Sequence, residues 1–186
     1  MENRQIIDTN DRRRILRFGL AGLCATVALP AWGAPVVPAG RRSLSFEHLH
    51  TGERASVDYW VDGTYVPGAL AEIDHVLRDF RTGEAIAMDR TLYDLLHALR
   101  DRLDTDAPFQ VISGYRSSRT NKALARKSRG VSRRSLHQFG KAIDVRIPGI
   151  PLKEYRKAAL SLKMGGVGYY PRSNFLHVDT GRVRFW

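Results

Sequence analysis

Two short apolar segments each place polar side chains where a buried strand should have none. In KAIDVRI (residues 141–147), aliphatic side chains alternate on one face, which leaves Asp144 on the other face. In FLHVD (residues 175–179), the same alternation leaves His177 and Asp179 opposite the aliphatic side chains. A carboxylate in such a strand needs a partner, because an unpaired buried charge is strongly destabilising. The two segments therefore predict neighbouring strands whose polar side chains lie together on one face of the sheet.

A histidine shortly before Asp144 completes a possible metal site. If the two strands pair, Asp144 and His177 share a face, and the loop before Lys141 can bring His137 over them. Two imidazoles, one carboxylate and one open position describe a catalytic zinc site. The alternative is a hydrogen-bonded His–Asp pair that holds no metal.

The remaining histidines are weaker candidates. His75 and His97 fall within segments of helical spacing, so we expect them to be structural. His48 and His50 alternate on one face of an expected strand, but no third ligand lies near them in the sequence.

The spacing of apolar residues predicts an α+β fold in a single domain, with a mostly antiparallel sheet flanked by helices. A hairpin is expected around Thr51-Gly52, and Asp62-Gly63 offers a second turn. The expected helices are 68–80, 89–103, 120–127 and 151–164, and the expected later strands are 109–115 (running into a loop), 141–147, 167–170, 175–179 and 182–186. GGVGYY (residues 165–170) lacks the spacing of a phosphate-binding loop, so we expect a turn into a strand whose aromatic residues could floor a cleft.

The N-terminal segment has the features of an export signal. Paired arginines and Arg17 precede an apolar run over residues 18–31, and small residues follow it. This arrangement is typical of a twin-arginine signal. We therefore expect a signal peptide over 1–33, cut after Gly33 or Ala34, and a short tether over 34–40.

Export limits the chemistry of the mature chain. Cleavage removes Cys24, the only cysteine, and so excludes disulfide and thiol chemistry. The apolar run is too short for a comfortable membrane span, so we expect no stable membrane insertion after cleavage and a periplasmic destination.

The chain is strongly basic, with a formal net charge of +11. Residues 116–134 contain eight Arg or Lys residues and no acid, a pattern that would suggest nucleic-acid binding in a cytoplasmic protein. Because the chain carries an export signal, we expect no nucleic-acid partner; the anion is instead the cell wall, whose stem peptides carry carboxylates. A solvated basic face without a partner is the alternative.

Three motifs, in this order along the chain, resemble those of a known peptidase group. Residues 113–117 read SGYRS, residues 135–144 fit SxHxxGxAxD, and a late histidine stands in HVDTG at 177–181. These motifs are similar to those of the zinc peptidases that include D-alanyl-D-alanine carboxypeptidases and dipeptidases. The ending, with Arg184 and Trp186, most resembles the exported MepK-type murein endopeptidases. The likeness spans residues 41–186.

The resemblance implies a hedgehog and D-Ala-D-Ala-peptidase-like zinc peptidase domain over 41–186, with Zn²⁺ held by His137, Asp144 and His177. It implies hydrolysis of peptide cross-links in peptidoglycan stem peptides. A carboxypeptidase acting on terminal D-alanine and a non-catalytic wall-binding module are the alternatives. Arg116 would hold a substrate carboxylate or the developing oxyanion.

The substrate contacts and the proton-transfer residue are less well defined. Ser135 and Tyr115 are candidate substrate contacts, and Ser135 could instead cap the loop. The carboxypeptidase relatives carry a catalytic acid three residues before the last zinc histidine, but Asn174 stands there in this chain. Asp179 could replace that acid as general base, or it could orient the imidazole of His177.

Overall fold

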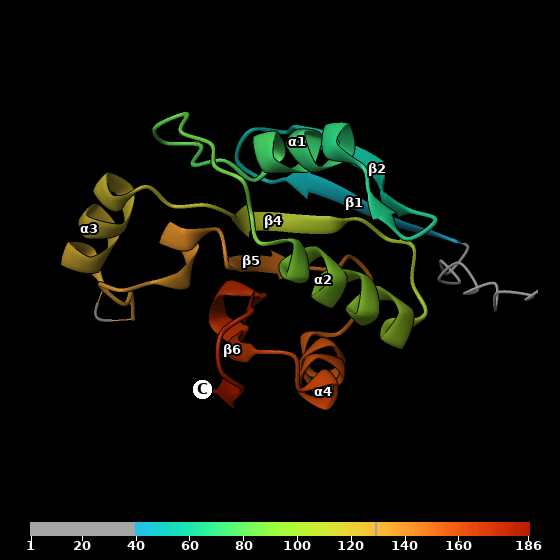
Figure 1. The fold of residues 1–186 in the computed structure, drawn as a ribbon. Helices are drawn as coiled ribbons and strands as arrows, with labels where there is room; N and C mark the ends of the chain where they lie inside the picture. The colour runs from blue at the N-terminus through green and yellow to red at the C-terminus, as the bar shows by residue number, and fades with distance from the viewer. Residues whose placement is uncertain (1–39, 129) are drawn as a thin grey trace, which may run out of the picture. The chain divides into compact units, whose positions relative to one another are not determined.

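The computed structural model describes residues 40–128 and 130–186, which form an open sheet with helices packed on it (Figure 1). The expected signal peptide (1–33) lies outside the described residues, as does the expected tether except for Gly40. Among the described residues, none of the helices combines the length and the apolar character needed to span a bilayer.

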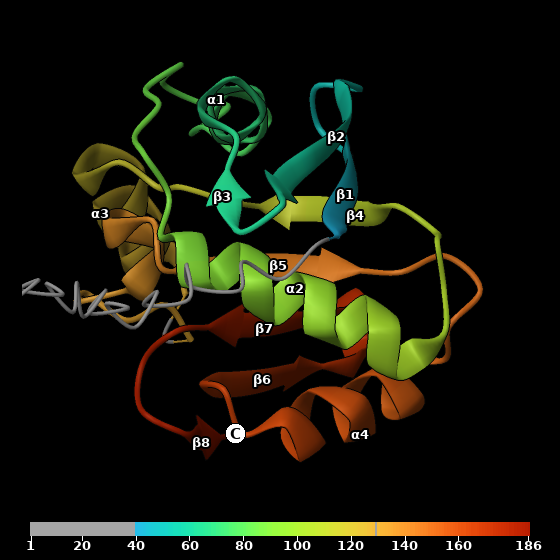
Figure 2. The same ribbon diagram turned by 45° about the vertical axis from the view of Figure 1, so that its right-hand side comes forward.

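The sheet has eight strands in the order β3-β2-β1-β4-β5-β7-β6-β8. The β1–β4 and β6–β8 pairs are parallel and the other pairs are antiparallel, which confirms the predicted α+β fold with a mostly antiparallel sheet. Figure 2 shows this succession from the β1–β2 hairpin to the C-terminal strand. The strands are β1 Arg41–His48, β2 Arg54–Val61, β3 Thr64–Tyr65, β4 Phe109–Ser113, β5 Ala142–Arg146, β6 Gly166–Tyr170, β7 Phe175–Asp179 and β8 Arg184–Phe185.

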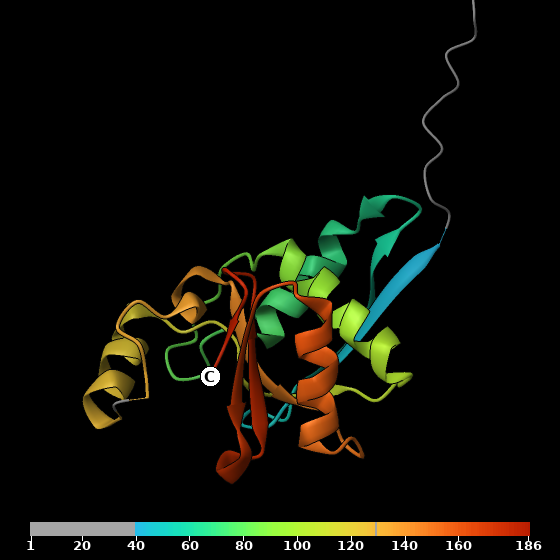
Figure 3. The same ribbon diagram turned by 90° about the horizontal axis from the view of Figure 1, so that it is seen from below.

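Three helices bury the core against the sheet, namely α1 (Pro67–Val76), α2 (Arg90–Leu103) and α4 (Leu152–Leu162). Their apolar side chains pack on the aliphatic side chains of β1, β4, β5 and β7. In Figure 3, α3 (Ser118–Lys127) stands at one end of the domain, away from α2 and α4. Two short 3₁₀ helices, η1 (Leu136–Phe139) and η2 (Pro171–Ser173), precede β5 and β7. The polar side chains of β5 and β7 therefore lie on the other face of the sheet, where the candidate site is.

Helix α4 ends at Leu162, two residues before the expected end, and two further helix boundaries differ for identifiable reasons. Helix α1 ends at Val76 instead of residue 80, because the chain turns at the fully buried Leu77. The carbonyl of Leu77 accepts a hydrogen bond from the amide of Tyr115 at 2.7 Å and so ties this turn to the SGYRS segment. Helix α3 begins two residues before Thr120, because the side chain of Ser117 caps it by accepting from the Thr120 amide.

Candidate metal centre and cleft

Two imidazoles and one carboxylate meet where β5 and β7 pair. The antiparallel register places Asp144 directly opposite His177, as the strand alternation predicts. His137 comes from η1, and Gly140, with φ of 65°, turns the chain from η1 toward β5. His137 Nε2 lies 3.2 Å from Asp144 Oδ1 and 3.1 Å from His177 Nδ1, which is itself 2.9 Å from Asp144 Oδ1.

The far nitrogens of both imidazoles have their own partners, which define where the protons lie. His137 Nδ1 is 2.7 Å from the carbonyl oxygen of Gly114, which can only accept, so this nitrogen carries the proton. His177 Nε2 is 2.9 Å from Asp179 Oδ2 and donates to that carboxylate. The two remaining nitrogens therefore point lone pairs at each other and at Asp144, an arrangement that calls for a cation between them.

The spacing of the three atoms fits a metal ion held by three protein ligands. Metal–ligand bonds of about 2.1 Å in tetrahedral geometry separate the ligand atoms by about 3.4 Å. The observed separations of 2.9 to 3.2 Å are a few tenths of an ångström shorter, a difference that small side-chain rotations can absorb. All three residues are buried, and they form a group that could hold a metal ion.

The electrostatics of the group also favour a bound cation. Burial lowers the pKa of His137. Burial alone would raise the pKa of Asp144, but the charges and hydrogen bonds of His137, His177 and Arg116 outweigh it and hold that pKa far below its usual range. Burial works against protonation of His177 as well, yet hydrogen bonds to Asp144 and Asp179 raise its pKa. A metal ion bound between the three groups would supply the positive charge that these hydrogen bonds favour at His177.

Arg116 supports the carboxylate of the group from the SGYRS segment. Its Nη2 donates to Asp144 Oδ2, and its Nε donates to Ser113 Oγ at 2.8 Å. Its backbone amide donates to the carbonyl of His137 at 3.1 Å, which ties the segment to η1. The guanidinium group has five N–H donors, so it can hold Asp144 and still present donors to a ligand.

Asp179 lies behind His177, fully buried in a network of hydrogen bonds. Its Oδ2 accepts from His177 Nε2 and from Arg184 Nη2, at 2.9 and 2.7 Å. Its Oδ1 accepts from Arg184 Nη1 and from the amides of Gly166 and Gly181, at 3.0, 3.1 and 2.8 Å. With both oxygens engaged on the far side of the imidazole, this geometry favours the orienting role over the role of general base.

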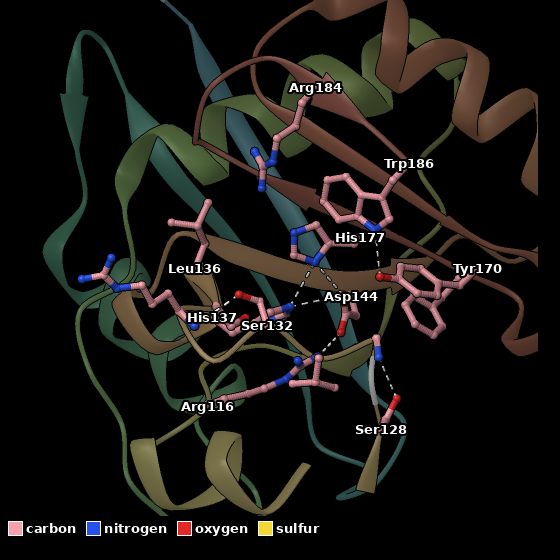
Figure 4. A pocket seen from close by; sticks show the side chains of 15 residues that line it. Arg116, Ser128, Ser132, Leu136, His137, Asp144, Tyr170, His177, Arg184 and Trp186 are labelled. Atoms are coloured by element: carbon pink, nitrogen blue, oxygen red, sulfur yellow. Dashed lines mark hydrogen bonds and ion pairs between the residues drawn. The ribbon is translucent and has the colours of Figure 1, made fainter. Parts of the chain in front are cut away.

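The ligand group opens into a cleft of about 570 Å³ (Figure 4). Trp186 stands over one side, with its ring centroid 5.3 Å from that of His177, and its Nε1 donates to the hydroxyl of Tyr170. The ring of Tyr170 stacks on Phe175 at 4.6 Å. A Cβ at Gly168 would lie 2.7 Å from the indole, so only glycine leaves Trp186 in this position. The cleft thus has one aromatic wall.

The other candidates from the sequence divide between the cleft and the core. Ser135 is buried and lines the cleft, where its side chain makes no capping hydrogen bond to η1. Tyr115 does not line the cleft; it packs against the hydrophobic core. Asn174 is exposed at the left-handed residue after η2, outside the cleft lining.

Sequence reasoning did not single out two cleft residues. In the sequence Arg134 is one residue of the basic run over 116–134; in the structure it lines the cleft, and its guanidinium group forms no ion pair with an acid among the described residues. Phe175 lies on the same face of β7 as His177, two residues away, and it also lines the cleft. The signal for Phe175 was its alternation with Leu176, whereas no local pattern separates Arg134 from its basic neighbours.

Comparison with known proteins gives a consistent match over this whole domain. The family described as peptidoglycan L,D-endopeptidase MepK matches residues 37–186. The peptidoglycan L,D-endopeptidase MepK of Escherichia coli K12 is 43% identical over 179 residues, which cover 96% of this chain and 98% of the relative. The probable peptidoglycan L,D-endopeptidase MepK of Haemophilus influenzae is 41% identical over 181 residues, with 97% of each chain covered.

Proposed function

The chain belongs to the MepK family of peptidoglycan L,D-endopeptidases, and on that basis we propose that it is a zinc-dependent endopeptidase that hydrolyses peptide cross-links of peptidoglycan. The observation that carries the proposal is the meeting of two imidazole lone pairs and one carboxylate oxygen in a cleft. Two nitrogens and one oxygen are a ligand set typical of catalytic zinc.

Bound zinc would lower the pKa of a water molecule to about 7 and polarise the scissile carbonyl. The residues of the chain would do the rest. His137, Asp144 and His177 hold the metal, and Asp179 fixes the ring of His177 through its Nε2 proton. Arg116 keeps Asp144 ionised and offers its remaining N–H groups to the oxyanion.

The remaining cleft residues would bind the substrate. Arg134 presents a guanidinium group without an acidic partner in the described chain, which suits a stem-peptide carboxylate. Trp186 and Tyr170, which lie together at the cleft, would contact the peptide through their rings. Ser135 has a free hydroxyl at the cleft wall and can bond the substrate backbone. Tyr115 would support this site from the core without touching substrate.

Periplasmic location and export by the twin-arginine route are part of the proposal. They rest on the paired arginines, the apolar run over 18–31 and the small residues around Gly33. Detection of an uncleaved chain in the cytoplasm would contradict them.

The proposal is tested by zinc stoichiometry measured together with the products of muropeptide digestion. The wild-type protein should bind one zinc ion and convert cross-linked dimers to monomers, and His177→Ala should lose both properties. His75→Ala is the matched control, because His75 is exposed on α1 and belongs to neither the ligand group nor the cleft lining. Undiminished hydrolysis by the His177 variant would refute the mechanism.

The same assay distinguishes the two alternatives. Loss of a single alanine from a stem peptide, with dimers left intact, would identify a carboxypeptidase. The observation that favours a binding module is Asn174, which stands where the carboxypeptidase relatives carry a catalytic acid, while Asp144 is the one acid among the described residues that line the cleft. That function would appear as wall binding without any change in muropeptide mass.

A further inference from the structure

A second pocket lies on α3 and the loop that follows it, separate from the cleft. It has a volume of about 370 Å³ and shares no lining residue with the cleft. Its lining comes from α3, the following loop and η1, and consists of Asn121, Lys122, Ala125, Arg126, Arg133 and Gln138. In Figure 3 these elements stand together at one end of the domain. We call this site the basic pocket.

The basic pocket gathers positive charge without any acid. Lys122, Arg126 and Arg133 contribute three cations, and none of them forms an ion pair with a described residue. Lys122 and Arg126 are one helical turn apart, and like charges at that spacing destabilise a helix. A bound anion would relieve this repulsion.

The wall between the basic pocket and the cleft is held in place by side-chain amides. Asn121 is buried, and its Nδ2 donates to the carbonyls of Ser132 and Arg133 at 3.0 and 3.3 Å. Gln138 Nε2 also donates to the carbonyl of Arg133, at 3.0 Å. Arg133 lines the basic pocket, whereas its neighbour Arg134 lines the cleft. Neighbouring residues of one loop, held at Ser132 and Arg133, therefore line the two sites.

We propose that the basic pocket binds a carboxylate of the second stem peptide of a cross-linked substrate. A cross-link joins two peptides, so a cleft that holds the scissile bond leaves a second acidic arm to be placed. An extended peptide spans about 3.3–3.6 Å per residue. A few residues of substrate are therefore enough to pass from the cleft at Arg134 to the basic pocket at Arg133. Guanidinium groups match carboxylates in geometry as well as charge. This inference rests on the proposed function.

The test compares two double variants of the full chain. Lys122→Gln with Arg126→Gln removes two charges one turn apart from the basic pocket. Lys153→Gln with Lys157→Gln removes two charges at the same spacing from the exposed face of α4, outside both pockets. The first variant should raise KM for muropeptide dimers about tenfold, with kcat unchanged and a weaker dependence on salt. The second should change KM less than about twofold.

Dimers with amidated stem carboxylates identify the anion. On amidated dimers the wild type and the basic-pocket variant should have the same KM, because the substrate no longer carries the carboxylate that the two proteins bind differently. Equal KM values for the two double variants on unmodified dimers would overturn the proposal. So would a basic-pocket variant that loses binding only to vesicles of anionic phospholipid. Failure of the wild type to cleave dimers would instead refute the proposed function.

Discussion

Replacement of Asp179 by asparagine separates the two roles that the sequence leaves open for this residue. Asparagine keeps the shape of the side chain but replaces one oxygen by an NH₂ group. Oδ2 now accepts from His177 and Arg184, and Oδ1 accepts from Arg184, Gly166 and Gly181. Whichever way the amide faces, a donor replaces an atom that accepts at least two hydrogens, and the charge that holds His177 is lost.

The expected cost follows from those lost contacts. Loss of an outer partner of a metal-binding histidine typically lowers metal affinity 10- to 100-fold, or about 1.4–2.7 kcal/mol. Buried donors left without an acceptor should lower the free energy of unfolding by about 1–3 kcal/mol. Activity should fall with metal occupancy and should recover when zinc is supplied in excess.

The assay is competition for zinc with a chelator of known affinity, alongside kcat measured at saturating zinc. Asp94→Asn is the matched control, because Asp94 accepts from Tyr59, Tyr65 and Arg42 in a part of the domain remote from the cleft. That variant should lose stability but keep its zinc affinity. A different pattern for Asp179→Asn would refute the reasoning: unchanged zinc affinity with a kcat loss of about 10²–10⁴ would identify Asp179 as a general base.

Four further predictions test the site and the fold. Gly168→Ala should displace the indole of Trp186 and raise KM several-fold, with zinc affinity unchanged; an unaltered KM would exclude the indole from substrate binding. Asn174→Asp, which also tolerates a left-handed conformation, should leave kcat/KM within about twofold, and a tenfold rise would show that this side chain reaches the reacting groups. Zinc at 100 times its Kd raises the free energy of unfolding by about 2.7 kcal/mol. Removal of zinc by a chelator should therefore lower Tm by about 5–10 °C in thermal unfolding, and an unchanged Tm would contradict a bound metal. Burial lowers the pKa of His48 to about 4, so as the pH falls below about 6.5 the unfolded chain takes up a proton that the folded chain does not. The contribution of His48 to the free energy of unfolding is therefore complete above pH 6.5, and that free energy should fall by about 2 kcal/mol at pH 5. Urea titrations of His48→Gln should show a smaller loss.

The ligand group could be predicted from the sequence because it depends on strand periodicity. Alternation in 141–147 and 175–179 fixes which side chains share a face, and one pairing register then brings Asp144 to His177. Other local signals predicted the β1–β2 hairpin, from its strand alternation and turn residues, and the start of α2 at the cap Asp89, whose side chain accepts from the Thr91 amide.

The cleft walls could not be predicted in this way, because they depend on contacts between distant segments. Trp186 reaches His177 only because β8 pairs with β6, and Gly168 leaves room for the ring. The irregular SGYRS segment has no periodicity, so the sequence does not show that Tyr115 packs inward while Arg116 points to the cleft. The helix boundaries at Leu77 and Ser117 likewise depend on bonds to other segments and to a cap.

The distribution of charge in the cleft limits what the chain itself contributes to the reaction. Among the described residues that line the cleft, Asp144 is the only acid, and its oxygens are engaged by His137, His177 and Arg116. A side-chain carboxylate is therefore not free to accept the proton of an attacking water. The cleft presents guanidinium groups instead, and we propose that they stabilise negative charge on a carbonyl oxygen and bind anionic substrate. The chain thus contributes position and positive charge, and loss of the Arg116 guanidinium should reduce kcat far more than any change at Asn174.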